Sequence, residues 1–404
     1  MLKKSSIQLI KNFLSLISIK GIDFIIPLII FPYLIKTIGI SNFGLLSFSL
    51  SFSLYFGAVI HYGFSITAVR DIARVKDNYK LLSKKFNIFI FTSISLFLIS
   101  LFIFLISIKF IPILNKDFDL HLSTFFLIAM QSFFPSWFFQ GIEDMKFIAY
   151  LNIGAKTVYL LALFLFINEP NDYIFVHVYY GVSITISTIT SFFLIKYKYK
   201  INFRLPEIKE VLGVLKEGRH AFLSQFSPNL YNNTATFVLG MTVSSSVLGV
   251  YASCTKIIDA FNSIGILLSN TFLPSISMDI KNHKFYKKLM LLIGGGLFLF
   301  SLLFSDLIVS IFIKENAEIV SRYFKLLTPM IFFIFIRFTY GNNYLMLIGK
   351  EKLYKNIVLL ICLLFFGLTF ILIPSLNIYG SIIIMLGASG TMALFTYIYY
   401  LKYK

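Results

Sequence analysis

Four basic side chains lie inside stretches of sequence that are otherwise apolar enough to cross a lipid bilayer. They are Lys20, Lys156, Lys256 and Arg337. A basic residue near the bilayer centre costs about 2.5–3.5 kcal/mol on insertion scales, so it usually faces protein, water or a bound group. Four such residues in one chain predict a water-filled interior with positive charge, which suits an anionic ligand.

Two of these bases are followed by an acid three residues later. Lys20 precedes Asp23, and Lys256 precedes Asp259, so each pair shares one face of a helix. Each pair could neutralise itself, which lowers the cost of insertion. Alternatively, Asp23 and Asp259 could take up an ion or a proton during function. The sequence leaves both interpretations open.

Lys156 and Arg337 have no acidic residue within one helical turn. A carboxylate on another helix could pair with either side chain; otherwise each faces a cavity and binds an anion. Arginine offers a planar fork for two phosphate oxygens, whereas lysine is a point charge. We therefore expect both side chains to contribute, with the other two bases, to a cationic substrate-binding cavity.

Prolines and amides occupy roughly corresponding positions in the two halves of the chain. Pro27 and Pro32 follow the first charged pair and predict a bend in that helix, with freed carbonyl groups that need partners or water. Three asparagines stand beside Pro228 in the second half: Asn229, Asn232 and Asn233. Interrupted polar helices in matching positions indicate a transporter's binding site, so these asparagines are candidates for its polar wall.

The composition is that of a membrane protein. The 404 residues are 58% hydrophobic and only 13% charged, whereas soluble domains are about 25% charged. A membrane helix takes about 20 residues. The apolar windows therefore predict an all-α polytopic membrane protein with twelve transmembrane helices, at 13–35, 43–66, 86–108, 120–140, 147–167, 174–195, 220–242, 248–274, 289–313, 320–347, 356–376 and 378–400.

The basic residues outside these windows predict the orientation. Of the 36 Lys and Arg residues, 26 lie on the side of both termini and six on the opposite side, so the positive-inside rule places both termini in the cytoplasm. The basic N-terminus lacks a small-residue cleavage site, and we expect a retained first helix rather than a signal peptide. The net charge of +18 is spread over short loops, which argues against nucleic-acid binding.

A weak internal repeat divides the chain. Residues 38–46 resemble residues 243–251, with Gly44 matching Gly249 at a spacing of 205 residues, and a second, shorter match has nearly the same spacing. This spacing predicts a parallel repeat of six helices each. The predicted domains are an N-terminal lobe, a cytoplasmic amphipathic linker and a C-terminal lobe, at 1–200, 201–219 and 220–404.

Signatures of catalysis are missing from the sequence. No acid pair or metal-ligating cluster lies in a loop large enough to form a pocket, and the longest loop opposite the termini has only about a dozen residues. A glycosyltransferase or a repeat-unit polymerase would need a larger loop there. We therefore expect no enzymatic activity, no cofactor and no metal.

Several motifs, in order, resemble those of Wzx-type O-antigen and polysaccharide repeat-unit flippases. These belong to the polysaccharide-transporter branch of the multidrug/oligosaccharidyl-lipid/polysaccharide (MOP) exporter superfamily. The resemblance covers essentially the whole chain and rests on the loop from Ile38-Gly39 to Phe43-Gly44, on Ala-Val-Arg-Asp-Ile-Ala-Arg at 68–74, and on residues 137–146 and 247–256. The chain departs from the pattern at 232–236, where the family often carries an Asp-Arg pair.

The resemblance implies two six-helix, pseudo-symmetric lobes around a central cavity, as in MATE transporters, working by alternating access with ion coupling. The implied cargo is an undecaprenyl-diphosphate-linked O-antigen oligosaccharide, moved from the cytoplasmic to the periplasmic leaflet of the bacterial inner membrane. The implied partners are this oligosaccharide, membrane lipids, a polysaccharide polymerase and chain-length proteins. A basic interior fits this cargo because it offsets the desolvation of a diphosphate.

Two alternatives remain open at this point. A cation-coupled MATE-like exporter of drugs or small molecules would favour an acidic or aromatic cavity, whereas the isolated charges within the windows are basic. A purely structural membrane scaffold would not account for charges placed so deep in apolar sequence.

Overall fold

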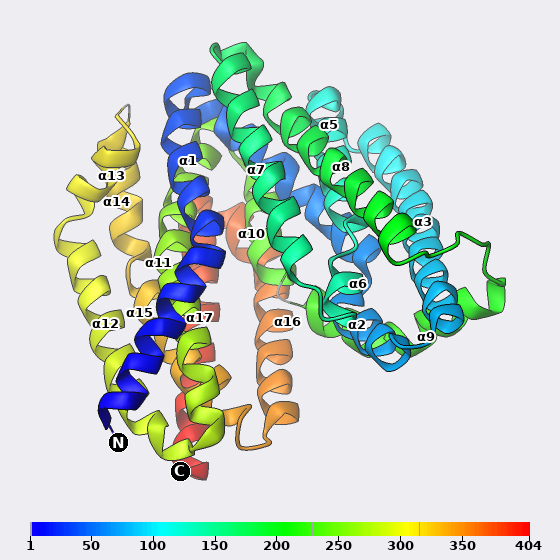
Figure 1. Ribbon diagram of the computed structural model, residues 1–404. Helices are drawn as coiled ribbons and strands as arrows, with labels where there is room; N and C mark the ends of the chain where they lie inside the picture. The colour runs from blue at the N-terminus through cyan, green and yellow to red at the C-terminus, as the bar shows by residue number, and fades with distance from the viewer. Residues whose placement is uncertain (1, 228, 315) are drawn as a thin grey trace. The chain divides into compact units, whose positions relative to one another are not determined.

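In the computed structural model the regular structure is entirely helical, with no strand among the described residues. The structure describes the backbone of all residues except 1, 228 and 315, and the side chains of 26–223, 225–227, 230, 233–314 and 316–404. The helices in Figure 1 are α1 (Leu2–His61), α2 (Phe64–Val75), α3 (Tyr79–Phe110), α4 (Pro112–Asn115), α5 (Phe118–Phe133), α6 (Ser136–Gly141), α7 (Lys146–Phe166), η1 (Pro170–Asp172), α8 (Tyr173–Lys198), α9 (Ile208–Phe226), α10 (Asn229–Thr242), α11 (Ser245–Met278), η2 (Ile280–Asn282), α12 (His283–Leu303), α13 (Ser305–Phe312), α14 (Ala317–Leu327), α15 (Pro329–Arg337), η3 (Phe338–Leu345), α16 (Glu351–Leu376) and α17 (Ile378–Tyr403).

Ten helical stretches within the described residues are long and apolar enough to cross a membrane. The first stretch, Ile26–Val75, covers two of the expected windows, and the break at Gly39 lies between them. The expected window 220–242 is occupied by the end of α9 and by α10, on either side of residue 228. The prediction of an all-α polytopic membrane protein is confirmed, and the count agrees with twelve helices.

The chain divides into two compact units. Unit 1 contains Met1–Ser47 together with Leu230–Lys404, and unit 2 contains Phe48–Asn229. Contacts therefore group the first 47 residues with the second half of the sequence, whereas the sequence led us to expect a division near residue 200. Ring contacts within unit 1, such as Phe31 with Phe312 at 5.8 Å between centroids, account for this grouping.

The break in α1 lies at a glycine and not at a proline. The helical backbone continues through Pro27 and Pro32, and departs from helical geometry at Gly39, with φ 78° and ψ 164°. This combination of angles is open almost only to glycine. The bend that we expected at the two prolines is therefore replaced, in the described residues, by a reorientation seven residues after Pro32.

Unit 1 contains a backbone crossing between α1 and the start of α11. A Cβ added to Gly44 would overlap the carbonyl oxygen of Ser245, and one added to Gly249 would overlap the carbonyl oxygen of Ile40. A hydrogen bond of 2.6 Å joins the hydroxyls of Ser41 and Ser245 beside the crossing. The contact is reciprocal, since Ile40 and Ser245 are 205 residues apart, as are Gly44 and Gly249. This reciprocity is what a two-fold relation between equivalent segments produces, and it agrees with the predicted repeat.

Unit 2 is built around α5, α7 and α8, which pack side by side (Figure 1). Its core at the α2–α6 end consists of aromatic side chains with almost no exposed surface, among them Phe86, Phe89, Trp137, Phe138 and Phe139. These rings meet mostly at tilted or edge-to-face angles, a geometry that aromatic quadrupoles favour. Unit 2 thus has a closely packed aromatic core at this end.

Helix α9 agrees with the predicted amphipathic segment but is longer than expected. It begins with a capping box between Glu207 and Glu210 and runs past residue 219 to Phe226. Apolar side chains at its start, Ile208 and Leu212, remain exposed, as expected of a helix lying at a membrane surface. Farther along, Phe222 stacks on Tyr62 at 4.8 Å between ring centroids, which fastens the helix to unit 2.

The crossing predicts a large difference between two glycine substitutions. Gly249→Ala forces the α1 and α11 backbones apart and should destabilise the protein by about 1–3 kcal/mol. Gly154→Ala is the matched control, because a Cβ at this helical position meets no atom within 4 Å; it should stabilise by about 0.5–1 kcal/mol. Thermal unfolding of the two purified variants in detergent measures the difference. Equal melting temperatures would contradict the crossing.

Candidate functional site

The predicted basic site residues that the structure describes all lie in candidate membrane spans. Lys156 is in α7, Lys256 in α11, and Arg337 ends α15. Four other predicted side chains fall outside the described residues: Lys20, Asp23, Asn229 and Asn232. Asn233 is described and is half-buried in α10. Lys156 belongs to unit 2, and the other described candidates belong to unit 1.

Lys256 and Asp259 share one face of α11, as predicted. Both side chains are exposed, and the two charges attract each other electrostatically. No ion pair within 4 Å joins them in the part of the chain that the structure describes. The two side chains therefore share a face of α11 without forming a direct salt bridge.

Arg337 lies at the transition from an α-helix to a π-helix. Helix α15 ends at Arg337 and continues as the π-helix η3. Its guanidinium lies 5.5 Å from the ring centroid of Phe338, and Nη1 is 3.8 Å from the sulfur of Met392. These are polarisable groups that tolerate a cation. A π-helical segment within a longer helix occurs frequently at functional sites. The side chains that bind to this π-helix therefore help to position Arg337.

Side chains from neighbouring helices hold the π-helix. The buried Asn343 accepts a hydrogen bond from the Ser269 hydroxyl at 3.1 Å and donates to the Ser269 carbonyl at 2.9 Å. Tyr354 donates to the Asn342 side chain at 2.7 Å. His283 Nε2 lies 2.9 Å from the Thr339 carbonyl oxygen. Hydrogen bonds from α11, α12 and α16 thus fix the segment that follows Arg337.

Lys256 and Arg337 lie at different levels of unit 1. Gly265 of α11 packs against the ring of Phe338, since a Cβ at Gly265 would lie 3.1 Å from that ring. Lys256 precedes Gly265 by nine residues, or roughly 14 Å along the helix axis. The structure therefore does not bring the two bases into contact with each other.

Lys156 is half-buried on α7. One turn further on, the buried Tyr159 stacks on Tyr180 of α8, with 4.4 Å between centroids and 17° between planes. The stack fixes the rotation of α7 about its own axis. The direction in which Lys156 leaves the helix is therefore set by the packing of unit 2.

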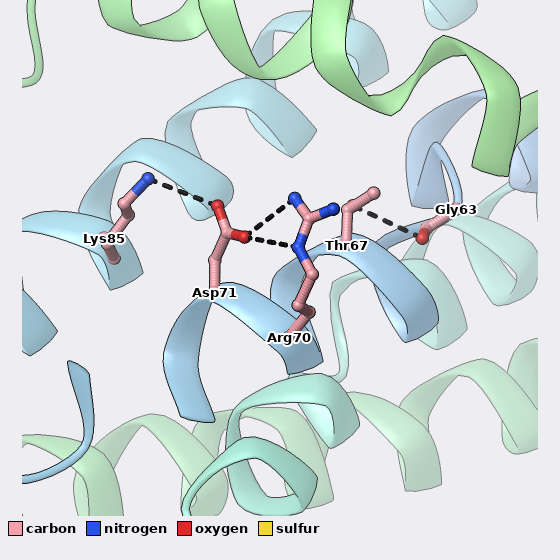
Figure 2. Close-up of polar contacts among 5 residues, drawn as sticks. All are labelled: Gly63, Thr67, Arg70, Asp71 and Lys85. Atoms are coloured by element: carbon pink, nitrogen blue, oxygen red, sulfur yellow. Dashed lines mark hydrogen bonds and ion pairs between the residues drawn. The ribbon is translucent and has the colours of Figure 1, made fainter. Parts of the chain in front are cut away.

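The motif at 68–74 forms an ion-pair cluster, shown in Figure 2. Asp71 is 8% exposed and binds two bases: Arg70 at 2.9 Å and Lys85 of α3 at 3.2 Å. On the same helix, Thr67 donates back to the Gly63 carbonyl at 3.4 Å. Asp71 therefore ties α2 to α3, and the role that this motif plays in the structure is to fix the connection between them.

The motif at 137–146 ends in a second anchored carboxylate. Asp144 accepts hydrogen bonds from Lys198 at 2.8 Å and from Tyr199 at 2.6 Å. These bonds lower the pKa of Asp144 to about 2, so its charge persists at physiological pH. The loop between α6 and α7 is thereby held against the end of α8.

Two buried histidines were missed by the sequence analysis. His121 on α5 and His177 on α8 are 0% and 8% exposed, and both belong to one hydrogen-bonded chain. A signal was available: each lies near the start of a predicted window, and both starts fall on the same predicted side of the membrane. A single histidine in an apolar window is ambiguous, and only the structure brings the two together.

Comparison with known proteins gives concordant matches. A sequence model of a family described as "Polysaccharide biosynthesis protein" matches residues 9–279. A candidate O-antigen transporter of Escherichia coli (strain K12) is 27% identical over 381 residues, covering 90% of this chain and 91% of the relative. One of Shigella dysenteriae is 22% identical over 394 residues, covering 95% and 98%.

Solved structures match in fold. The chain superposes on an inward-facing multidrug resistance MATE family transporter of the MOP superfamily with a TM-score of 0.70, at 13% identity, over 94% of this chain and 97% of that one. A MOP superfamily transporter from Pyrococcus furiosus, described as having a binding pocket of reversed polarity, gives a TM-score of 0.55 at 12% identity, over 99% and 95%. The MATE/MOP fold that the sequence resemblance implied is confirmed.

The ion-pair cluster of Figure 2 predicts an asymmetry between two neutralising substitutions. Asp71→Asn leaves two bases without their buried carboxylate and should cost about 1–3 kcal/mol of stability. Glu143→Gln removes an exposed pair, with Lys76 at 2.9 Å and a Glu143 side chain 71% exposed, and should cost less than about 1 kcal/mol. Thermal unfolding in detergent compares the two. A larger loss for Glu143→Gln would show that Asp71 is not an anchor.

Proposed function

Because the chain belongs to the polysaccharide biosynthesis protein family and has the MATE/MOP transporter fold, we propose that it is a flippase for lipid-linked oligosaccharides. Its cargo would be an undecaprenyl-diphosphate-linked O-antigen repeat unit. The cargo would move from the cytoplasmic to the periplasmic leaflet by alternating access coupled to an ion. The protein would act as a transporter and not as an enzyme.

The observation that carries this proposal is the presence of basic side chains within the membrane spans. Lys156, Lys256 and Arg337 each stand in an apolar helix, where a base is costly unless it faces protein, water or a ligand. A diphosphate brings negative charge into the same region, and the bases offset its desolvation. We propose Lys20 as the fourth base of the cavity. The polar wall of the cavity would be formed by Asn229, Asn232 and Asn233. Asp23 and Asp259 would act as ion-pair or proton-coupling groups.

The different levels of Lys256 and Arg337 favour a long anionic ligand over a compact one. A repeat unit joined to a diphosphate extends over several sugar rings, so acidic sugars or phosphate could meet bases at separate depths. The lipid tail can stay in the bilayer while the sugars cross in water. The relatives named for O-antigen transport support this cargo class.

A MATE-like drug exporter is the second candidate, and the structural neighbours are the observation that favours it. The MATE transporter and the Pyrococcus furiosus protein are only 13% and 12% identical to this chain, so they support the fold alone. A cationic drug would be repelled by the bases in the spans. Export of cationic dyes that is lost on deletion of the gene would favour this second candidate.

The proposed location is the bacterial inner membrane, with both termini in the cytoplasm and with a polysaccharide polymerase and chain-length proteins as partners. The topology gives a testable expectation. Alkaline phosphatase inserted after Lys116 should be active, because this loop would face the periplasm, and the same insertion after Lys80 should be inactive. A fluorescent protein at the C-terminus should fluoresce. Activity after Lys80 would reverse the proposed orientation.

Removing either charge should strongly reduce export. In cells that lack the chromosomal gene, Lys156→Gln and Arg337→Gln should each lower surface polysaccharide by at least about tenfold, the loss expected if each charge contributes about 1.4 kcal/mol or more to binding of the cargo. Lipid-linked units should accumulate on the inner leaflet at the same time. Quantifying both by lipid extraction and surface polysaccharide gels gives the readout.

The controls separate charge from folding. Lys156→Arg and Arg337→Lys keep the charge and should retain much of the export. Lys209→Gln removes an exposed charge outside the spans and should have no effect. Wild-type export by a variant carrying both Lys156→Gln and Arg337→Gln, at equal amounts of protein in the membrane, would refute the binding role.

A further inference from the structure

Three helices of unit 2 meet in a buried polar chain that the binding site does not use. The His121 Nδ1 atom lies 2.9 Å from the hydroxyl of Ser49 on α1. That hydroxyl lies 2.7 Å from the Thr124 hydroxyl, which in turn lies 2.7 Å from Nδ1 of His177 on α8. Thr124 also donates to the Leu120 carbonyl at 2.7 Å. The chain thus links two imidazoles through two hydroxyls.

Counting protons assigns the direction of these hydrogen bonds. Each hydroxyl has one proton, and Ser49 donates its proton to Thr124. The Ser49 oxygen therefore accepts from the His121 imidazole, while the Thr124 proton has two acceptors at 2.7 Å, the Leu120 carbonyl and His177 Nδ1. His121 thus donates from Nδ1, and in a neutral ring this leaves its Nε2 with the lone pair.

The Nε2 atom of His121 is buried and has no hydrogen-bond partner among the described residues. The rings of Phe48 and Phe52 stand edge-to-face with it, at 5.6 and 6.1 Å between centroids. A buried acceptor without a partner costs about 1–3 kcal/mol. The other groups of this network are hydrogen-bonded, so the unpaired Nε2 atom of His121 is an exception that requires an explanation.

Protonation of Nε2 is the event that the network allows without rearrangement. An imidazolium has N–H on both nitrogens, so Nδ1 continues to donate to Ser49 and every other bond of the chain stays in place. The proton binds to the Nε2 lone pair and displaces nothing. In the conformation described, a charge at this apolar site would be costly, so proton uptake requires a conformation in which water reaches the ring.

Charged and titratable groups lie at the ends of three of the helices around the site, α3, α5 and α8. Lys116, Asp117 and Asp119 lie around the start of α5, Lys109 near the end of α3, and Asp172 and Tyr173 at the start of α8. On α1, no charged residue lies between Lys36 and Ser49. None of these groups is hydrogen-bonded to His121 in the part of the chain that the structure describes. The two acids at the start of α5, Asp117 and Asp119, can attract protons from water to this end of the helix. They do not themselves pair with the His121 ring.

We propose that His121, linked to His177 through Ser49 and Thr124, is a proton-binding site that couples a proton to the conformational cycle. A group whose proton affinity differs between two conformations shifts their balance when it is protonated. The proposal rests on the proposed transport function for its role, because it names the residues that carry the coupling ion. Under the proposed topology both histidines stand at the periplasmic ends of their helices, where protons would enter.

The first measurement detects the proton itself. Nitrogen-15 NMR of the full chain, with labelled histidine, resolves the five histidines, and histidine-to-asparagine variants assign them. Lowering the pH from 8 to 5 should convert the His121 Nε2 from an unprotonated to a protonated signal while Nδ1 stays protonated. Thr124→Val, which cuts the link, should move the titration midpoints of His121 and His177 apart.

The second measurement tests coupling. In liposomes containing lipid-linked oligosaccharide extracted from the deletion strain, a pH gradient should accelerate flipping by the wild type. His121→Asn should flip at the wild-type rate without a gradient but show no acceleration, because asparagine still donates to Ser49 and cannot bind a proton. His220→Asn is the matched control, because His220 is exposed and belongs neither to the binding site nor to the His121 chain.

The outcomes separate this proposal from the transport function. An Nε2 that stays unprotonated down to pH 5, with full acceleration in His121→Asn, overturns the proton site. Titration of His121 together with loss of acceleration supports it. If His121 titrates but neither protein flips the lipid, the proton site stands and the cargo assignment fails. If His121→Asn does not fold, Ser49→Ala tests the same link and should shift the His121 midpoint.

Discussion

Two backbones that leave no room for a side chain at Gly44 and Gly249 set the geometry of unit 1. The crossing lies five residues after the break at Gly39 and near the start of α11. Lys256 follows Gly249 by seven residues, which is close to two full turns. The helix face that touches α1 at Gly249 is thus the face that presents Lys256, and Asp259 lies nearly one turn further along it.

Charge and helix geometry together give the account of function. Membrane spans satisfy their backbone groups internally, so departures from α-helix are tolerated only where side chains or water supply partners. The π-helix after Arg337 has such partners in Asn343, Tyr354 and His283. A base that follows a rigidly packed helix and precedes a held π-helix is well suited to bind phosphate in one fixed position, because little ordering is needed when the ligand arrives.

Much of the fold could be predicted from the sequence, because hydropathy reports which stretches cross a bilayer regardless of their neighbours. The repeat and its glycine match were also visible, although their direct contact was not. Local rules failed where tertiary packing decides. Pro27 and Pro32 suggested a bend, yet the helix continues through both and turns at Gly39. The π-helix after Arg337 depends on side chains of other helices, and the His121 chain joins residues up to 128 positions apart, which no local pattern shows.

The central claim is that basic side chains in the membrane spans bind the diphosphate of a lipid-linked cargo. The most direct measurement is the affinity of the purified protein for undecaprenyl diphosphate compared with uncharged undecaprenol, by native mass spectrometry of the wild type and of Arg337→Gln. Preferential binding of the diphosphate by the wild type, reduced about tenfold or more by the substitution, is the predicted result. Equal binding of the two lipids by the wild type would contradict the account.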